Sequence, residues 1–395
     1  MHIAVDVRCL AEKNLTGVGE YAKQLLTEMT AMGENHVFTF FYNSYTSVKL
    51  NFTAPANCKI NYCHTRLPNK LLNLSLALFR QPKLNLWLEK KFNLPKIDLF
   101  FFPNTAFLAC SCPYIITAHD LGYEFFPEFL NFKRRLLSKL LRPKKVLSEA
   151  KKVIAISKQT AEDVHNFYQI PKEKIQIIYS GVSPLFKQLE ASDPRLSAIK
   201  IKFSLPEKFN FFLGTVEPRK NLSALITALT KDSLPLVIAG ASGWKNQDLL
   251  NKINDTPKIT YLGYVSDEEK LCLYNLAETF VYPSHYEGFG FPPLEAMSAG
   301  CPVIAGNNSS LSEILGTAPL LVNSYDPAEL SLALNLMKNE ETRSLYQEKG
   351  FEKVKEFFWK QTAKETYTVI MDTPQLSSCA LSRHPELDSG SVKVS

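Results

Sequence analysis

The sequence predicts an α/β protein with two parallel-sheet domains that face a cleft. At 395 residues the chain is too long for one ordinary hydrophobic core, so two domains are expected. In both halves short apolar runs alternate with helical patterns, and this alternation breaks at residues 181–184, which read Gly-Val-Ser-Pro. Glycine turns follow several of the apolar runs, and open α/β sheets bind ligands at the carboxyl ends of their strands.

The composition is that of a globular protein without membrane spans. Hydrophobic residues make up 45% of the chain and charged residues 21%, and no apolar run approaches the roughly 18 residues that cross a bilayer. The first residues, MHIAVDVRCL, form a strand pattern rather than a signal peptide, so we expect a cytoplasmic protein. The eight cysteines lack metal-ligand spacing and are expected to be reduced thiols.

The first half begins with a strand at 2–7, a glycine turn, and a helix at 18–29. One face of this helix carries Tyr21, Leu25, Leu26 and Met29. The run at 98–102 is continuously apolar, as in a strand that is buried on both sides. The other strands predicted in this half cover residues 36–42, 59–64, 114–118, 153–157 and 175–179.

Two places in this half are candidate ligand contacts. Gly17 and Gly19 form a glycine turn at a helix N-terminus, a geometry that cradles phosphate, although such turns are common without a ligand. His119 follows the strand at 114–118 and would point into the cleft, where it can donate a hydrogen bond. A His–Asp pair at a strand end is also commonly structural, so the residues alone leave both interpretations open.

Two leucine-rich basic segments suggest a peripheral contact with an anionic membrane. Residues 69–92 form a helical hairpin broken near Gln81–Pro82, which either dips into a lipid interface or packs on the domain's own core. Residues 132–145 form a helix whose leucine stripe is flanked by cations, which suits an anionic membrane or a solvated helix face. Nine Lys or Arg residues oppose Glu149 alone between 133 and 152. No recognition motif for nucleic acid accompanies them, so no nucleic-acid partner is expected.

The second half restarts the alternation with a strand at 209–213. The turn after it ends in Arg219 and Lys220 at a helix N-terminus, and two cations there suit a diphosphate leaving group. Further strands are expected at 235–240, 259–265, 280–282 and 302–304, and helices at 192–201, 267–276, 326–338, 341–358 and 359–371.

The stretch 280–313 combines a strand, a glycine loop, a helix and a second strand. Glu287 precedes the glycines of the loop, and Glu295 lies in the helix with seven residues between the two carboxylates. A glycine loop at a helix N-terminus offers backbone N–H donors to an anion or a polyol. A carboxylate beside that loop can accept hydrogen bonds from sugar or ribose hydroxyls. The spacing alone does not separate this site from a tight turn followed by a solvated acid.

The full string resembles the retaining family 4 glycosyltransferases of the GT-B fold. Their signature, Y-P-S-x-x-E-G-F-G-x-P-x-x-E-A-M-A-x-G-x-P-V, is matched almost residue for residue from Tyr282 to Val303. T-x-H-D-L at His119 and E-P-R-K-N at Arg219 also match the family. Thr215 departs from it, because many members carry arginine there, and this departure leaves the nucleotide preference open. The resemblance covers about residues 1–371.

The resemblance implies two Rossmann-like, doubly wound domains and assigns roles to their residues. Residues 1–184 would bind the acceptor, 185–358 the nucleotide sugar, and a helix at 359–372 would cross back to the first domain. Arg219 and Lys220 would hold the diphosphate, so that no metal and no other cofactor is needed. The implied catalytic residues are Glu287, His119, Lys220 and Arg219. The implied donor-binding residues are Gly17, Gly19, Arg219, Lys220, Glu287, Gly288, Phe289, Gly290, Phe291 and Glu295, with Glu287 on the sugar and Glu295 on the ribose.

The same resemblance implies transfer of a hexose, with mannose favoured, from a nucleotide-diphosphate sugar to a glycan or lipid-linked acceptor. The expected setting is surface polysaccharide or lipopolysaccharide synthesis, and the expected mechanism is a same-face displacement assisted by the departing phosphate. A nucleotide-sugar epimerase and a catalytically silent partner of a glycan-assembly complex are the alternatives. Residues 373–395 lose all apolar periodicity and are expected to be disordered.

Overall fold

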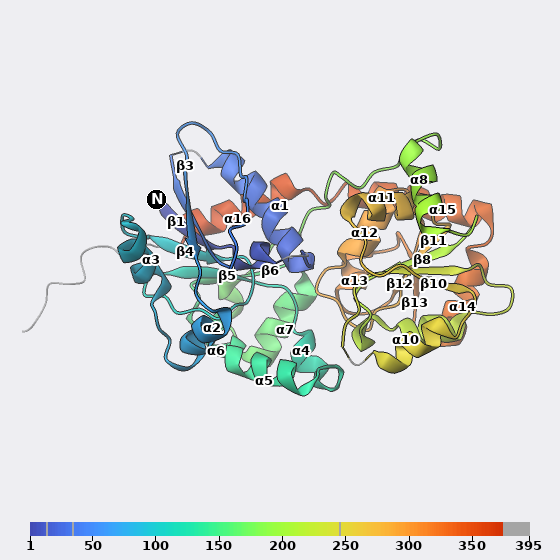
Figure 1. The fold of residues 1–395 in the computed structure, drawn as a ribbon, viewed down its shortest axis with the longest axis horizontal. Helices are drawn as coiled ribbons and strands as arrows, with labels where there is room; N and C mark the ends of the chain where they lie inside the picture. The colour runs from blue at the N-terminus through green and yellow to red at the C-terminus, as the bar shows by residue number, and fades with distance from the viewer. Residues whose placement is uncertain (13–14, 34, 245, 374–395) are drawn as a thin grey trace, which may run out of the picture.

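The protein consists of two lobes, each with a central sheet covered by helices (Figure 1). The computed structural model describes residues 1–12, 15–33, 35–244 and 246–373. The predicted disordered tail therefore lies, from residue 374 onward, outside the described residues. Every strand pairing in the two sheets is parallel.

The sheet of the first lobe has the strand order β3-β2-β1-β4-β5-β6-β7. The chain winds outward from the central strand β1 in one direction and then in the other, which is the doubly wound pattern of Rossmann-like sheets. The strands are β1 (His2–Asp6), β2 (Val37–Asn43), β3 (Lys59–Thr65), β4 (Leu99–Phe102), β5 (Tyr114–Ala118), β6 (Lys152–Ala155) and β7 (Ile175–Ile177).

Helices cover both faces of this sheet because neighbouring strand residues point to opposite sides. Ile3 and Val5 of β1 belong to the same buried cluster as the inner face of α1, whereas Ala4 belongs to a second cluster with residues of α2, α3, α6 and α7. The predicted face of α1, with Tyr21 and Leu25 among its residues, is fully buried. The helices of this lobe are η1 (Arg8–Ala11), α1 (Gly17–Met32), α2 (Asn69–Leu78), α3 (Leu84–Phe92), α4 (Gly122–Phe125), η2 (Pro127–Phe129), α5 (Phe132–Leu141), α6 (Pro143–Glu149), α7 (Lys158–Tyr168) and η3 (Lys172–Lys174).

The sheet of the second lobe repeats this winding with the order β10-β9-β8-β11-β12-β13. Its strands are β8 (Asn210–Leu213), β9 (Leu236–Ala239), β10 (Ile259–Tyr261), β11 (Thr279–Tyr282), β12 (Val303–Gly306) and β13 (Leu320–Val322). Its helices are α8 (Pro194–Phe203), η4 (Pro218–Lys220), α9 (Leu222–Ala228), α10 (Gln247–Asn254), α11 (Asp267–Leu276), α12 (Phe291–Ser298), α13 (Ser309–Leu315), α14 (Pro327–Leu336) and α15 (Glu340–Val354). The predicted two-sheet α/β fold is confirmed.

The chain crosses between the lobes twice, and the two crossings pack backbone against backbone. Val182 donates its N–H to the carbonyl of Phe357 at 3.2 Å. A Cβ on Gly181 would lie 2.2 Å from the backbone nitrogen of Trp359, so only glycine allows this approach. After the second crossing α16 (Trp359–Met371) packs against α1 of the first lobe (Figure 1). The boundary residues 184 and 358 themselves stay a prediction.

The basic leucine-rich run at 132–145 is not one helix, contrary to the prediction. α5 ends at Leu141, Arg142 adopts the left-handed conformation with φ 49°, and α6 begins at Pro143. Proline disfavours a helical residue before it and clashes with the preceding turn, so the helix breaks there. The predicted hairpin at 69–92 does break between α2 and α3, around Gln81–Pro82.

Candidate active site

The glycine loop between β11 and α12 carries Glu287 into the space between the lobes. The side chain of Glu287 is 9% exposed. Gly290 ends the loop with φ +106°, and a Cβ there would lie 2.7 Å from Leu311. Proline in the first turn of α12 then starts the helix without leaving a backbone N–H unpaired. The end of the loop is therefore fixed by a glycine and by the prolines that follow it.

Glu287 forms a buried ionic cluster with the two predicted cations. Lys220 Nζ lies 2.7 Å from Glu287 Oε1, and an Arg219 Nη lies 3.0 Å from Oε2. Ser284 Oγ donates a 2.5 Å hydrogen bond to Oε1, and Glu217 pairs with the other side of Arg219 at 3.0 Å. Both oxygens of Glu287 are thus occupied by donors, and the two cations are balanced by two carboxylates.

The charge state of Glu287 follows from this cluster. Burial by itself raises the pKa of the carboxyl group, but the positive charges of Arg219 and Lys220 outweigh burial. With the hydrogen bonds from Lys220 and Ser284 they lower the pKa of Glu287 to about 2. Glu287 is therefore a carboxylate at neutral pH.

Tyr282 and Ser284 also belong to this cluster, although neither was among the predicted site residues. Lys220 Nζ donates a 2.5 Å hydrogen bond to the hydroxyl of Tyr282, which is fully buried at the end of β11. Both residues stand in the string that carries the family resemblance, at positions that precede the glycine loop. Their place at the carboxyl end of a central strand was the available signal.

Glu295 lies apart from the ionic cluster and has its own partners. Its Oε2 accepts a 3.0 Å hydrogen bond from the hydroxyl of Tyr274, and the positive charge of Lys270 is close by. Burial raises the pKa of Glu295 to about 7, although Lys270 and Tyr274 act in the opposite direction. The two carboxylates of the sequence motif therefore have opposite pKa shifts and separate partners.

One ring nitrogen of His119 is already bonded within its own lobe. Its Nε2 lies 2.8 Å from the carbonyl of Pro103, and because a carbonyl only accepts, Nε2 carries the proton. Burial lowers the pKa of His119, so the ring is neutral and Nδ1 is left as an acceptor. The expected contact between His119 and a donor sugar stays a prediction.

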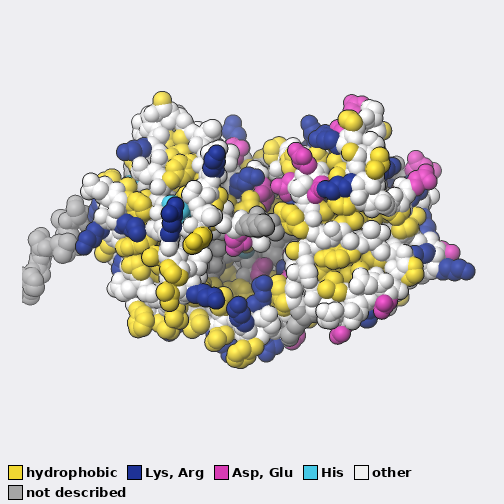
Figure 2. Space-filling model, viewed as in Figure 1, with side chains coloured by type: hydrophobic (Ala, Val, Ile, Leu, Met, Phe, Trp, Pro, Cys, Tyr) yellow, Lys and Arg dark blue, Asp and Glu magenta, His cyan; other side chains and the backbone are white. Residues whose placement is uncertain are grey.

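The two lobes meet where the predicted site residues face each other. A Cβ on Gly288 would lie 1.9 Å from the carbonyl oxygen of His119, and a Cβ on Gly17 would lie 3.9 Å from the ring of Phe291. The structure thus brings Gly17 and His119 of the first lobe to the glycine loop of the second. Figure 2 shows the surface hollowed between the lobes, with acidic and basic side chains around the hollow.

Gly19 and Phe289, two of the predicted contact residues, face the interior of the protein and not the place where the lobes meet. A Cβ on Gly19 would contact Leu15 and the carbonyl of Cys9 within its own lobe, so this glycine permits close packing. The ring of Phe289 is buried against Phe291 and Phe357. Only the backbone of Phe289 can reach a ligand.

Several side chains tie the lobes together, and sequence patterns did not identify them. Glu313 accepts hydrogen bonds from the backbone N–H groups of Lys158 and Gln159, at 2.7 and 2.9 Å, and so caps α7 from the opposite lobe. Trp244 donates through Nε1 to the carbonyl of Phe129 at 2.6 Å. These partners are more than a hundred residues apart, so no local pattern links them.

Two family models match the chain, one in each lobe. The model described as Glycosyltransferase Family 4 matches residues 15–184, and the model described as Glycosyl transferases group 1 matches residues 197–353. Together they span most of both lobes, and the second includes the ionic cluster and Glu295.

Two curated relatives are similar to this chain in sequence. The O-antigen chain mannosyltransferase B of Escherichia coli is 27% identical over 368 residues, which cover 89% of this chain and 95% of the relative. The O-antigen chain mannosyltransferase RfbU of Salmonella typhimurium is 29% identical over 283 residues, which cover 68% of this chain and 74% of the relative.

A solved structure supports the fold independently. Sucrose-phosphate synthase from Thermosynechococcus elongatus superposes with a TM-score of 0.70 at 20% identity, over 94% of this chain and 98% of that one. This similarity establishes the fold, and the family models establish the chemistry class. The chain is therefore a glycosyltransferase with a Glycosyltransferase Family 4 domain followed by a Glycosyl transferases group 1 domain, and it has the GT-B fold.

Proposed function

We propose that this glycosyltransferase transfers a mannose-type hexose from a nucleotide-diphosphate sugar to a glycan or lipid-linked acceptor of surface polysaccharide or lipopolysaccharide synthesis. The similarity to two O-antigen chain mannosyltransferases supports the sugar and the pathway class. The observation that carries the proposal is the meeting of the Arg219–Lys220–Glu287 cluster with Gly17 and His119 across the cleft. We place the reaction on the cytoplasmic side.

In this proposal Arg219 and Lys220 stabilise the leaving group. As the bond between the sugar carbon and the diphosphate breaks, negative charge builds on the nucleotide, and Arg219 and Lys220 stabilise it in a buried setting. Glu287 and Glu217 hold both cations in place before the substrate arrives. Two fixed cations supply charge that a metal ion would otherwise supply, so we propose a metal-independent reaction.

The hydrogen bonds of Glu287 favour a same-face displacement over a double displacement as the route to retention of the anomeric configuration. A double displacement would need a free carboxylate oxygen at the anomeric carbon, but both oxygens of Glu287 accept hydrogen bonds or ion pairs. In the proposed step the bond to the diphosphate breaks while the acceptor oxygen bonds to the same face of the sugar carbon. The acceptor's proton passes to the departing phosphate oxygen.

A donor screen tests the proposal. Purified protein is heated with GDP-, UDP-, dTDP- or ADP-sugars, and one nucleotide class is expected to raise the melting temperature. A donor present at 100 times its dissociation constant stabilises by about 2.7 kcal/mol, which is easily measured. Addition of a lipid-linked acceptor should then yield an α-configured product from an α-configured donor, unaffected by a chelator. Conversion of the donor without any acceptor would instead reveal an epimerase.

Nucleotide affinity is expected to depend on pH through Glu295. Its pKa of about 7 lies above the ordinary 4.5, so it becomes a full carboxylate only above neutrality. A carboxylate accepts stronger hydrogen bonds from ribose hydroxyls than the protonated acid does. We expect nucleotide binding, measured by calorimetry, to weaken by up to about tenfold as the pH falls from about 8 to about 6.

The matched variant for this test is Glu295→Gln, which cannot titrate. It should bind the nucleotide weakly at every pH in the range, and a pH slope equal to that of the wild type would refute the assignment. The free energy of unfolding of the nucleotide-free wild type should change in the opposite direction and rise as the pH falls. The stabilisation from a raised pKa is complete below 4.5 and is lost as the pH rises through about 7.

A further inference from the structure

The first lobe exposes an unusual number of large apolar side chains on two neighbouring helices. Helix α5 has no buried residue, although an amphipathic helix of a globular protein normally buries its apolar stripe. Phe132 of α5 is 82% exposed, and Leu71 of α2 is 63% exposed. Helices α2 and α5 are in contact. The exposed apolar residues, here called the α2–α5 face, are Leu71, Leu74, Leu78, Phe79, Phe132, Leu136 and Leu137.

A dense group of cations borders this face. Residues 131–148 contain no acidic residue, and their cations are exposed. Figure 2 shows apolar side chains along the lower edge of the first lobe, with Lys and Arg side chains close above them. The exposed cations of α5 and α6, including the residue between them, are Lys133, Arg134, Arg135, Lys139, Arg142, Lys144 and Lys145.

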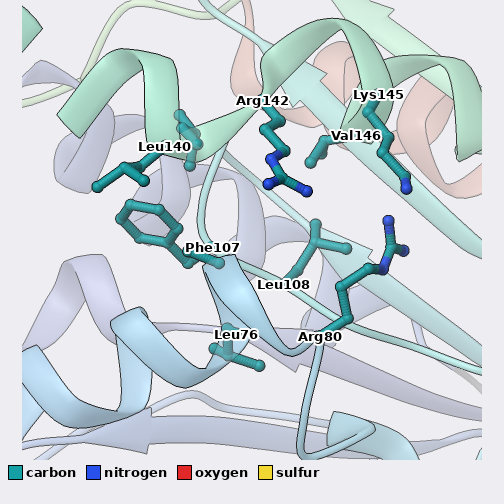
Figure 3. A pocket seen from close by; sticks show the side chains of 10 residues that line it. Leu76, Arg80, Phe107, Leu108, Leu140, Arg142, Lys145 and Val146 are labelled. Carbon is teal, nitrogen blue, oxygen red and sulfur yellow. The ribbon is translucent and has the colours of Figure 1, made fainter. Parts of the chain in front are cut away.

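A small pocket lies between α2 and the break that separates α5 from α6. Like the α2–α5 face, it is lined by both apolar and basic side chains. Its walls are apolar, whereas Arg80, Arg142 and Lys145 reach into it from opposite sides (Figure 3). Arg80 pairs with Glu149 at 2.5 Å. Among the described residues no carboxylate pairs with Arg142, so its charge is open to an external anion. The apolar walls are formed by Leu76, Ala77, Phe107, Leu108, Leu140, Leu141 and Val146.

We propose that the α2–α5 face docks on a lipid bilayer that carries anionic headgroups. The exposed leucines and phenylalanines would enter the interface, and the bordering cations would meet lipid phosphates. This arrangement explains why α5 leaves Phe132, Leu136 and Leu137 exposed to solvent. No helix within the described residues is long and apolar enough to cross a membrane.

The position of the face relates it to the active site. Arg8, which follows β1, donates hydrogen bonds to the carbonyl of Phe107 and to Asn73 of α2. These bonds tie α2 to the carboxyl end of the central strand β1, where we place the cleft. Arg134 of α5 stacks on Trp244 of the second lobe at 3.6 Å. If the proposed function holds, docking would place the cleft beside a lipid-linked acceptor. The docking proposal itself does not depend on that function.

Vesicle flotation of the full chain tests the proposal. The wild type is expected to float with vesicles of phosphatidylglycerol and phosphatidylcholine at low salt, and to bind less at high salt because screening weakens the attraction. It should float poorly with phosphatidylcholine alone. The double variant Leu136→Glu/Leu137→Glu is expected to bind at least about tenfold more weakly, since two apolar side chains are lost from the interface.

The matched control is Leu332→Glu/Leu336→Glu, which changes two exposed leucines of α14 in the other lobe. This variant should bind like the wild type. Both variants should melt like the wild type, because the altered side chains are not buried. Absence of wild-type binding to the anionic vesicles, or equal losses in the two double variants, would overturn the proposal. So would a wild-type dimer, seen by sedimentation, that Leu136→Glu/Leu137→Glu dissociates.

Discussion

Glutamine in place of Glu287 is expected to lower turnover by about 10²–10³-fold, because the variant removes a fixed charge that positions two cations at the leaving group. Glu287 binds Lys220, Arg219 and Ser284 at once, and glutamine cannot pair with both cations. Turnover of donor and acceptor by the purified variant, at saturating substrate, measures the effect. A variant with nearly wild-type turnover would discard the proposed site.

The Glu287 variant is also expected to lose stability, and this effect must be separated from the loss of turnover. Breaking a buried ion pair leaves uncompensated charge and typically costs about 3–5 kcal/mol. Denaturant titration of the variant measures that cost, and activity is compared at a temperature where both proteins are folded. Glu278→Gln is the control, because it breaks the 3.0 Å pair with Arg343 elsewhere in the second lobe and should leave turnover intact.

Methionine in place of Lys220 is expected to lower kcat by about 10²–10³-fold while changing KM less, since the charge it neutralises develops mainly in the transition state. Lys220 is buried and bonds to Glu287 and to the hydroxyl of Tyr282. Steady-state kinetics with varied donor separates kcat from KM. An increase in KM alone would mean that Lys220 serves ground-state binding and not departure of the nucleotide.

Two further variants sharpen the Lys220 experiment. Tyr282→Phe removes only the hydroxyl that accepts from Lys220, so its effect on kcat should be much smaller than that of Lys220→Met. Lys202→Met is the matched control, because Lys202 pairs with Glu269 on the surface of the same lobe. Equal losses of kcat in Lys202→Met and Lys220→Met would point to a general charge effect and contradict the assignment.

The strand and helix order could be predicted because each element carries a local signal. The buried strands β4 and β5 are continuous apolar runs, and the predicted face of α1 repeats at helical spacing. The short edge strand β13 was not predicted. The prediction of a single helix at 132–145 was wrong, because the local effect of Pro143 outweighs the leucine periodicity and breaks the helix.

The sequence by itself determined the two-lobed α/β fold, the glycine loop with its two glutamates, and the cation pair at Arg219 and Lys220, because these depend on neighbouring residues. Only the tertiary structure decided that Glu287 pairs with both cations and that Glu295 stays apart from them. The same holds for His119, whose tautomer is set by the distant carbonyl of Pro103. Charge state and hydrogen-bond direction depend on burial and on partners far along the chain, and these exist only once the lobes have folded together.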